Sequence, residues 1–264
     1  MPQLDRAFGR QAFGADPAGY DAVRPAYPDW VFETLQERCG LKAGSAVFEI
    51  GAGTGIATRR LLALGADPLA AVEPDARLAA YLAATSANPA LTIVGAPFES
   101  AELPAGAFDL GLSATAFHWL DEDTALAKIA TLLKPGGWWA ALWNVFGDDS
   151  REDPFHDATA HLFEDAVDSP SRGAADQPFG LDVDARVAAL QRSGAFEAIS
   201  WRIEPWPLVL TADQTVALYA TYSNVNARPD RSQLLADLGR IARDDFGDRV
   251  VRNMTTSLFL ARKR

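Results

Sequence analysis

The sequence is poor in the residues that build disulfide-stapled or metal-held folds. Its 264 residues include one cysteine, Cys39, and three histidines. A single cysteine excludes an internal disulfide and a cysteine-built metal site. His156 and His161 lie five residues apart, off the i, i+4 spacing of a helical metal pair, so no metal is expected there. The chain must therefore rely on its hydrophobic core, and we expect a reducing, cytoplasmic setting.

Basic residues and long apolar runs are also scarce. Lys and Arg total 24 against 35 Asp and Glu, a formal net charge of -11. Polyphosphate partners call for basic surfaces, so this balance argues against nucleic acid and against anionic membranes. No apolar run approaches the ~18–20 residues of a membrane span, and residues 1–10 lack the apolar core of a secretory signal. We therefore expect neither a nucleic-acid nor a membrane partner.

What the sequence does contain is an alternation of short apolar runs and helical patterns. Strands are expected at 46–50, 69–73, 91–94, 108–113 and 138–143, with helices over 56–64, 75–84 and 121–133. This order predicts βαβ units, a parallel sheet and helices on both of its faces. Ligands of such sheets bind beyond the carboxyl ends of the strands.

Further elements are expected on both sides of this core. They are helices over 29–38, 153–166, 184–191, 211–222 and 230–245, a turn over 134–137, and strands over 196–210 and 250–262. The segment between the last two strands is expected to cover the sheet edge.

The strongest functional signal is a glycine-rich turn directly after the first expected strand. The run reads Glu49-Ile50-Gly51-Ala52-Gly53-Thr54-Gly55. Glycines let the backbone approach a ligand that a Cβ would block, and the following helix adds free N–H groups. Taken alone, the run could also be a tight turn that binds nothing.

Two details favour an adenosine ligand without a pyrophosphate. The dinucleotide fingerprint needs a small residue where this chain has Ile56, and no Gly-Lys-Ser/Thr follows as in a Walker loop. Glu73 ends the second expected strand, about 20 residues after the glycines, where a carboxylate can accept both ribose hydroxyls. By itself Glu73 could be a solvated strand-end acid, but together the turn and the acid are far more specific.

These motifs resemble the class I S-adenosylmethionine-dependent methyltransferases, in the small-molecule branch known as methyltransferase type 11. The resemblance covers residues 13–145 and rests on segments 48–55, 72–75, 95–99, 108–110, 116–119 and 132–137 and on Tyr20, Arg24 and Tyr27. It implies an α/β fold: a Rossmann-like, doubly wound, seven-stranded sheet, mostly parallel with an antiparallel last strand, plus a helical lid.

The resemblance also implies S-adenosyl-L-methionine as cofactor and S-adenosyl-L-homocysteine as product. The implied cofactor-binding residues are Tyr20, Arg24, Glu49, Gly51, Ala52, Gly53, Thr54, Gly55, Glu73, Pro74, Pro97, Phe98, Glu99, Ala114 and Phe117. Glu49 and the glycine turn would hold the methionine end, and Arg24 would face its carboxylate. Many relatives carry Asp at the position of Ala96, so adenine is expected to rely on backbone contacts and stacking here.

The implied reaction moves a methyl group by in-line displacement to a small molecule, with an oxygen acceptor preferred. His118 is the candidate base because imidazole titrates near neutral pH; alternatively it only shapes the pocket wall. Substrate contacts are expected from Trp119, Asn144, Tyr219 and Tyr222. For Asn144 a turn role stays open, and for the two tyrosines core packing stays open.

We expect a single methyltransferase domain over residues 1–264. Residues 1–44 would be an N-terminal cap segment and 45–145 the cofactor-binding core, with 146–181 and 211–248 as substrate-lid insertions. Two other functions remain open: a catalytically silent protein that binds the cofactor or its product, and an NAD-dependent oxidoreductase, which Ile56 disfavours. The oligomeric state is not predicted.

Overall fold

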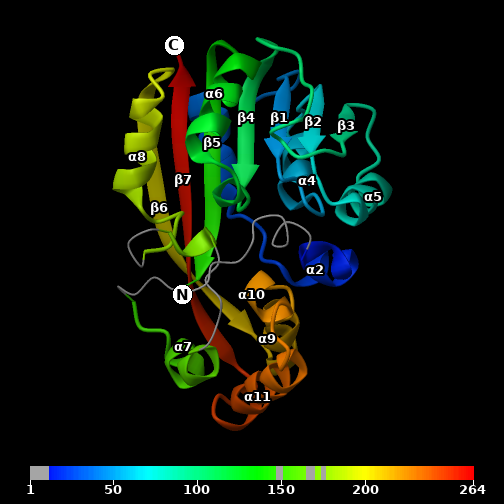
Figure 1. The fold of residues 1–264 in the computed structure, drawn as a ribbon, viewed down its shortest axis with the longest axis vertical. Coiled ribbons are helices and arrows are strands. Elements are labelled where there is room, and N and C mark those ends of the chain that lie inside the picture. The colour runs from blue at the N-terminus through cyan, green and yellow to red at the C-terminus, as the bar shows by residue number, and fades with distance from the viewer. Residues whose placement is uncertain (1–11, 147–150, 165–169, 174–176) are drawn as a thin grey trace.

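A seven-stranded sheet forms the body of the molecule (Figure 1). The computed structural model describes residues 12–146, 151–164, 170–173 and 177–264. The strand order is β3-β2-β1-β4-β5-β7-β6; β1 to β5 pair in parallel, and β7 runs antiparallel to both β5 and β6. This arrangement confirms the predicted doubly wound sheet with an antiparallel last strand. Expectations for residues 1–11, 147–150, 165–169 and 174–176 lie outside the described residues.

The strands follow the apolar runs of the sequence. They are β1 (Val47–Ile50), β2 (Leu69–Val72), β3 (Leu91–Val94), β4 (Phe108–Ala114), β5 (Leu133–Phe146), β6 (Phe196–Leu210) and β7 (Val250–Lys263). One correction concerns β5, which begins at Leu133 although residues 134–137 were expected to form a turn. Leu133 pairs with Phe108, and the register then shifts before Leu110 pairs with Trp138. The glycines there bend the strand without ending it.

The helices begin largely at the expected caps. They are α2 (Pro17–Val23), α3 (Asp29–Cys39), α4 (Ile56–Ala63), α5 (Ala76–Thr85), α6 (Glu122–Leu132), α7 (Pro154–Thr159), α8 (Val183–Arg192), α9 (Ala212–Tyr219), α10 (Ser223–Asn226) and α11 (Arg231–Asp244). The side chains of Asp75, Asp121 and Thr211 accept backbone N–H groups at their helix starts.

Two expected helices are shorter than the sequence indicated. The helix expected over 153–166 ends as an α-helix at Thr159 and continues as a 3-10 turn, Ala160–Phe163. The hydroxyl of Thr159 bonds back to the carbonyl oxygen of Phe155 at 2.7 Å, a bond that often bends helices. The helix expected over 211–222 ends at Tyr219, and α10 follows after a break.

Strand alternation sends neighbouring residues to opposite faces of the sheet. Val47 packs with α3 and α4 on one face, whereas Phe48 and Ile50 pack with α6 and α8 on the other. Glu49 shares the α4 side with Val47, which explains how an acid comes to be buried between the sheet and that helix.

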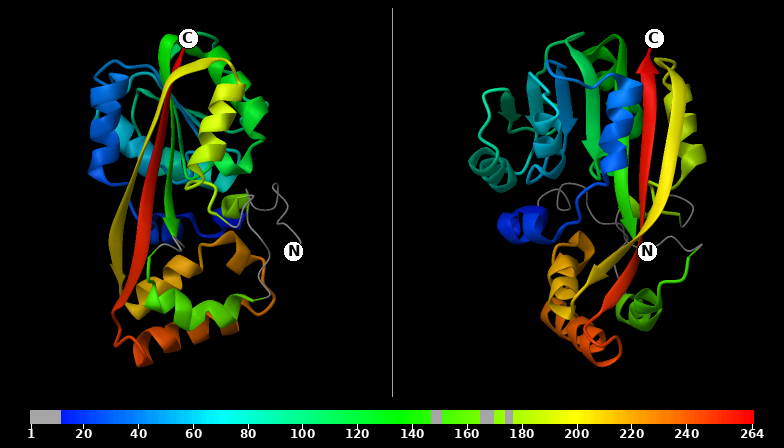
Figure 2. Two further views of the ribbon diagram at one scale, coloured as in Figure 1. Left: turned by 90° about the vertical axis from the view of Figure 1, so that its left-hand side faces the viewer. Right: turned by 180° about the vertical axis from the view of Figure 1, so that it is seen from behind.

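Four helices gather beyond the carboxyl ends of β1, β4 and β5 and form what we call the lid: α7, α9, α10 and α11 (Figures 1 and 2). The lid has its own hydrophobic cluster, which includes Phe155, Leu218, Leu238 and Val250. The ends of β6 and β7 reach down into it and tie it to the sheet. None of the helices in the described ranges is both long and apolar enough to cross a membrane.

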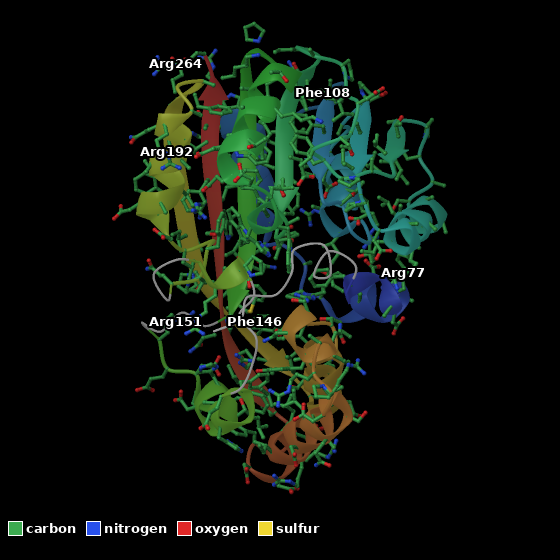
Figure 3. All side chains as sticks on the ribbon, viewed as in Figure 1. Arg77, Phe108, Phe146, Arg151, Arg192 and Arg264 are labelled. Atoms are coloured by element: carbon green, nitrogen blue, oxygen red, sulfur yellow. The ribbon has the colours of Figure 1, made fainter. Side chains whose placement is uncertain are left out.

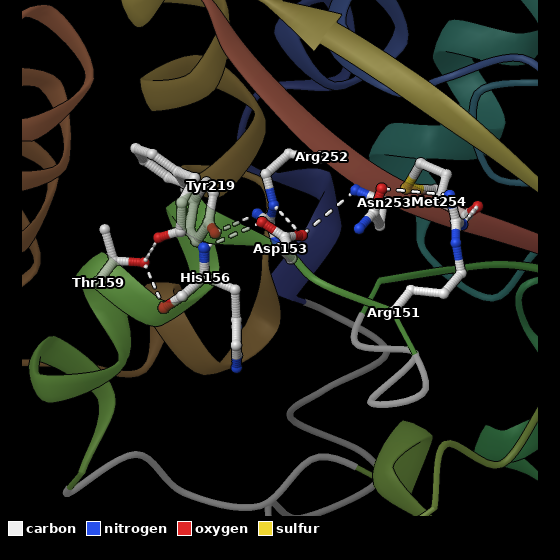
Figure 4. A network of polar contacts seen from close by, with 9 residues as sticks. Arg151, Asp153, His156, Thr159, Tyr219, Arg252, Asn253 and Met254 are labelled. Atoms are coloured by element: carbon white, nitrogen blue, oxygen red, sulfur yellow. Dashed lines mark hydrogen bonds and ion pairs between the residues drawn. The ribbon is translucent and has the colours of Figure 1, made fainter. Parts of the chain in front are cut away.

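A buried ion pair lies inside the lid (Figure 4). Arg252 of β7 is 2% exposed, and its Nε donates to Asp153 at 2.8 Å. Its guanidinium also donates to the hydroxyl of Tyr219, and Asp153 accepts the backbone N–H of His156 at 3.0 Å. Burial acts to raise the pKa of Asp153, but the bonds from Arg252 outweigh it and hold the pKa below its ordinary value. One carboxylate thus joins α7 to β7.

We expect Asp153→Ala to lower the free energy of unfolding by about 3–5 kcal/mol, because the charge of Arg252 would stay buried without a partner. Thermal unfolding measures the change. Asp213→Ala is the control, since Asp213 is the exposed partner of Arg243 and its loss should change little. Equal melting temperatures for the two variants would contradict a structural role for the buried pair.

Candidate functional site

A cavity of about 690 Å³ lies where the carboxyl ends of the strands meet the N-terminal segment and the lid. Phe146, which lines it, ends β5 at the junction of sheet and lid, while Phe108, at the start of β4, lies at the far end of the sheet (Figure 3). The cavity therefore occupies the rim at which ligands bind in doubly wound sheets.

The three glycines after β1 differ in what they do. All three have positive φ: 69° at Gly51, 58° at Gly53 and 94° at Gly55. A Cβ on Gly51 would come within 2.4 Å of Ala116, and one on Gly55 within 2.4 Å of Leu82. A Cβ on Gly53 would meet no atom of the described residues within 4 Å, and this residue lines the cavity. Gly51 and Gly55 thus allow close packing, and Gly53 presents bare backbone to open space.

Glu73 connects the end of β2 to this turn. Its Oε2 accepts the backbone N–H of Gly53 at 2.7 Å, and its Oε1 accepts that of Asp75 at 2.9 Å. The residue is 4% exposed but lines the cavity. Burial raises the pKa of Glu73 to about 7, against the opposing effect of the two backbone bonds. At neutral pH the protonated and ionised forms of Glu73 therefore have similar populations.

Glu49 is buried behind the turn and not among the residues lining the cavity. It accepts the hydroxyl of Thr58 in α4 at 2.6 Å. Burial raises its pKa to about 8, with Glu73 adding to the rise and Thr58 opposing it. Its contact joins β1 to α4 on either side of the glycine turn.

The N-terminal segment crosses the open side of the cavity. Asp21 in α2 forms an ion pair with Arg59 of α4 at 2.7 Å. Tyr27 donates to the hydroxyl of Thr115, just after β4, at 2.9 Å. These contacts hold Phe13 and Tyr20 on the cavity wall, where the Phe13 ring lies 5.9 Å from that of Trp119.

Arg24 links this segment to the lid. Its guanidinium lies 4.8 Å from the ring centroid of Tyr20 and 4.9 Å from that of Tyr222, and it donates to the carbonyl oxygen of Thr221 at 3.0 Å. The Nε of Arg24 and the hydroxyl of Tyr222 are buried and have no hydrogen-bond partner among the residues that the structure describes. Both residues line the cavity.

His118 follows β4 and is held by Trp143 of β5. The indole N–H of Trp143 donates to His118 Nδ1 at 3.1 Å. Because indole nitrogen only donates, Nδ1 must be the unprotonated nitrogen, and a neutral ring then carries its proton on Nε2. The atom that would take up a proton is thus already engaged. The role of His118 as a base stays a prediction, and the bond to Trp143 holds its ring in the cavity wall.

Asn144, at the end of β5, is occupied within the chain. Its Nδ2 donates to the carbonyl oxygens of Pro25 and Ala26 at 3.2 and 3.3 Å, and its Oδ1 accepts the hydroxyl of Thr256 at 2.6 Å. The residue lines the cavity, yet its amide serves to hold the N-terminal segment against the sheet.

The structure brings most, but not all, of the expected site residues together. Those on the cavity wall are Tyr20, Arg24, Gly51, Gly53, Glu73, Pro74, Phe98, Ala114, His118, Trp119, Asn144 and Tyr222. Those not on it are Glu49, Ala52, Thr54, Gly55, Pro97, Glu99, Phe117 and Tyr219.

Two of the absent residues are held in hydrophobic cores. Phe117 packs against Trp139 beneath the sheet rim, with ring centroids 5.2 Å apart. Tyr219 is buried in the lid, bonded to Arg252, which corrects its expected contact with substrate.

The sequence analysis missed several wall residues, among them Phe13, Thr115, Trp143, His156 and Arg172. Thr115 has a positive φ of 55°, which a sequence pattern does not reveal. Within the described ranges, no group of three or more His, Cys, Asp or Glu side chains is arranged to hold a metal.

Comparison with known proteins assigns this chain to a family. Residues 48–141 match the family model for the methyltransferase domain. The uncharacterized methyltransferase GK2543 of Geobacillus kaustophilus is 31% identical over 159 residues, 59% of this chain and 67% of that protein. The uncharacterized methyltransferase Rv3342 of Mycobacterium tuberculosis is 33% identical over 138 residues, 51% of this chain and 52% of that protein. The chain belongs to the class I S-adenosylmethionine-dependent methyltransferases, and its alignment spans about half the length of relatives such as Rv3342.

Solved structures share the fold over nearly the whole chain. Phosphoethanolamine N-methyltransferase 2 of Haemonchus contortus, in complex with phosphomonomethylethanolamine and S-adenosylhomocysteine, has a TM-score of 0.61 at 15% identity, covering 98% of this chain and 59% of that one. The [4+2]-cyclase SpnF has a TM-score of 0.62 at 15% identity, covering 100% and 98%. One is named a methyltransferase and the other a cyclase, so the fold alone does not fix the reaction.

We expect the ligand-free protein to lose stability as the pH rises from about 5 to 8.5. The pKa values of Glu49 and Glu73, about 8 and 7 in the folded chain, lie above the ordinary 4.5, so folding favours their protonated forms. Their contribution is fully present below 4.5 and is lost as the pH rises through 7 and 8. Melting temperature against pH measures it. Glu49→Gln should flatten the slope, whereas exposed Glu37→Gln should keep it; identical slopes in both would contradict the assignment.

Proposed function

We propose that the protein binds S-adenosylmethionine and transfers its methyl group to a small-molecule acceptor. The observation that carries this proposal is the bond between Glu73 and Gly53 on the cavity wall. Each carboxylate oxygen of Glu73 accepts one backbone N–H and keeps a second lone pair. The side chain can therefore accept two ribose hydroxyls without releasing the glycine turn. Bare backbone at Gly53 leaves room for the ligand beside it.

Other residues of the cavity wall suit the adenine ring and the methionine part of the cofactor. Apolar Leu78 and Phe98 line the cavity and suit the adenine ring, since Ala96 offers no side-chain acceptor. Arg24 and Tyr20 suit the methionine carboxylate, as the family resemblance implies. We assign Glu49 a positioning role, because its bond to Thr58 holds β1 and α4 around the turn.

Position is the main contribution of this chain to the reaction. When bound, the cofactor supplies an activated methyl group on a positively charged sulfur. Holding two reactants in line can lower the barrier by ~7–11 kcal/mol. Tyr20, Trp119 and Trp143 line the cavity, and a ring face near the sulfur stabilises its charge by ~0.5–2 kcal/mol.

The state of His118 favours an oxygen acceptor that is already deprotonated. Its Nδ1 accepts the indole N–H of Trp143, so the neutral ring carries its own proton on Nε2. The ring therefore has no unoccupied nitrogen with which to remove a proton from the acceptor. A carboxylate oxygen needs no base to attack a methyl group. We therefore propose O-methylation of such an acceptor, with His118 in the cavity wall.

The lid is proposed to select the acceptor. Residues 45–145 form the core that would hold the cofactor, and parts of 146–181 and 211–248 supply the wall opposite it. A volume of about 690 Å³ falls within the range of small-molecule pockets, ~300–1,000 Å³. Cofactor and a compact metabolite are the occupants that this volume suits.

Replacing the acid tests the cofactor site. We expect Glu73→Gln to weaken S-adenosylhomocysteine binding by roughly 1–3 kcal/mol, since the amide nitrogen cannot accept a hydroxyl. Wild-type affinity should rise as the pH passes upward through about 7, because the ionised carboxylate is the better acceptor, and the variant should lack this rise. Calorimetry measures both. Exposed Glu33→Gln should behave as wild type, and a pH-independent, unchanged dissociation constant in Glu73→Gln would count against the site.

Transfer itself is tested with a labelled methyl group. We expect wild-type protein to pass label from S-adenosylmethionine to an acidic component of a metabolite extract, and Glu73→Gln to do so more slowly at limiting cofactor. Scintillation counting of separated products measures it. Tight binding of S-adenosylhomocysteine with no label transferred would favour the catalytically silent binding protein.

A further inference from the structure

Within the described part of the chain, two buried donors at the lid side of the cavity have no hydrogen-bond partner. They are Arg24 Nε and the hydroxyl of Tyr222. The residues come from opposite sides of the cavity, Arg24 from the N-terminal segment and Tyr222 from the break between α9 and α10. They meet with the guanidinium 4.9 Å from the tyrosine ring centroid. Buried polar groups without partners are costly, so this pair indicates a ligand group that completes it.

Tyr222 is available as a donor. Burial raises the pKa of its hydroxyl above the ordinary value, so the phenol keeps its proton at neutral pH. Its ring is fixed by Phe146 and Tyr219, with centroid distances of 5.8 and 5.1 Å. The hydroxyl therefore has a defined place on the wall and does not swing freely.

The charge of Arg24 on the cavity wall favours an anion. Among the described lining residues Glu73 is the only acid, and it lies at the end of β2, whereas Arg24 lies on the lid side. The cofactor brings one carboxylate, but its ammonium and its positive sulfur make its net charge positive, so it does not by itself balance this wall. An acidic acceptor would complement both the wall and the sulfonium.

We propose that Tyr222 and Arg24 receive a carboxylate of the methyl acceptor, which makes the acceptor a small organic acid. This inference rests on the proposed methyltransferase function. Arg24 lies between the rings of Tyr20 and Tyr222 and so borders both the cofactor tail and the acceptor. A two-oxygen, singly charged group matches one phenol and one guanidinium N–H.

Matched pairs of acids and amides test the proposed carboxylate site. Protein saturated with S-adenosylhomocysteine is titrated with benzoate and its neutral counterpart benzamide, and with acetate and acetamide. Wild type should bind each acid about tenfold more tightly than its amide, the scale of a charge-assisted hydrogen bond. Tyr222→Phe should lose most of this preference and keep the wild-type affinity for S-adenosylhomocysteine. Tyr219→Phe, the matched control, removes a hydroxyl bonded to Arg252 away from the cavity and should keep the preference.

Two results would contradict the proposed carboxylate site. One is equal binding of acid and amide by the wild-type complex. The other is a Tyr222→Phe variant that loses affinity for S-adenosylhomocysteine but not for 5′-methylthioadenosine, because the phenol would then serve the carboxylate of the cofactor. A third outcome is that the wild-type protein does not bind S-adenosylhomocysteine at all. This result would contradict both the proposed function and the proposed carboxylate site.

Discussion

The cavity depends on one hydrogen bond, from the backbone N–H of Gly53 to Glu73. The two residues follow β1 and β2, neighbouring strands whose parallel register pairs Ile50 with Val72, so the sheet itself sets their separation. If Glu73 lost its carboxylate, the backbone N–H of Gly53 would lose its hydrogen-bond acceptor at the cavity wall. Without glycine, the positive φ at this position would be strained. Turn and acid, separate in the sequence, are thus one structural unit.

Closure of the cavity depends on tethers between distant segments. α2 has seven residues, too few to be a stable helix alone, so its place comes from tertiary contacts. Asp21 fixes it to α4, Tyr27 to the end of β4, and Arg24 to the lid. Arg24 thus contacts the lid and borders the proposed cofactor site at the same time.

Local patterns predicted the strands, the helix caps and the pairing of glycine turn with acid, because each depends on residues close in sequence or on regular βα spacing. They could not separate Tyr219 from Tyr222, which were expected on one helix face. The helix ends at Tyr219, and Tyr222 becomes the N-cap residue of α10, so one ring enters the lid core and the other the cavity wall. The protonation of His118 was equally hidden, since it is set by Trp143 across the pairing of β4 and β5.

The polar groups at the strand ends are engaged within the chain. Glu73 accepts two backbone N–H groups, and His118 is bound through its accepting nitrogen. Under the proposed function, these residues would act by holding the reactants in place. The reaction would then depend on orientation, which is sensitive to displacements of about 1 Å. A lid held by the buried pair of Arg252 and Asp153 meets that requirement, because it fixes α7 and the Tyr219–Tyr222 turn relative to the sheet.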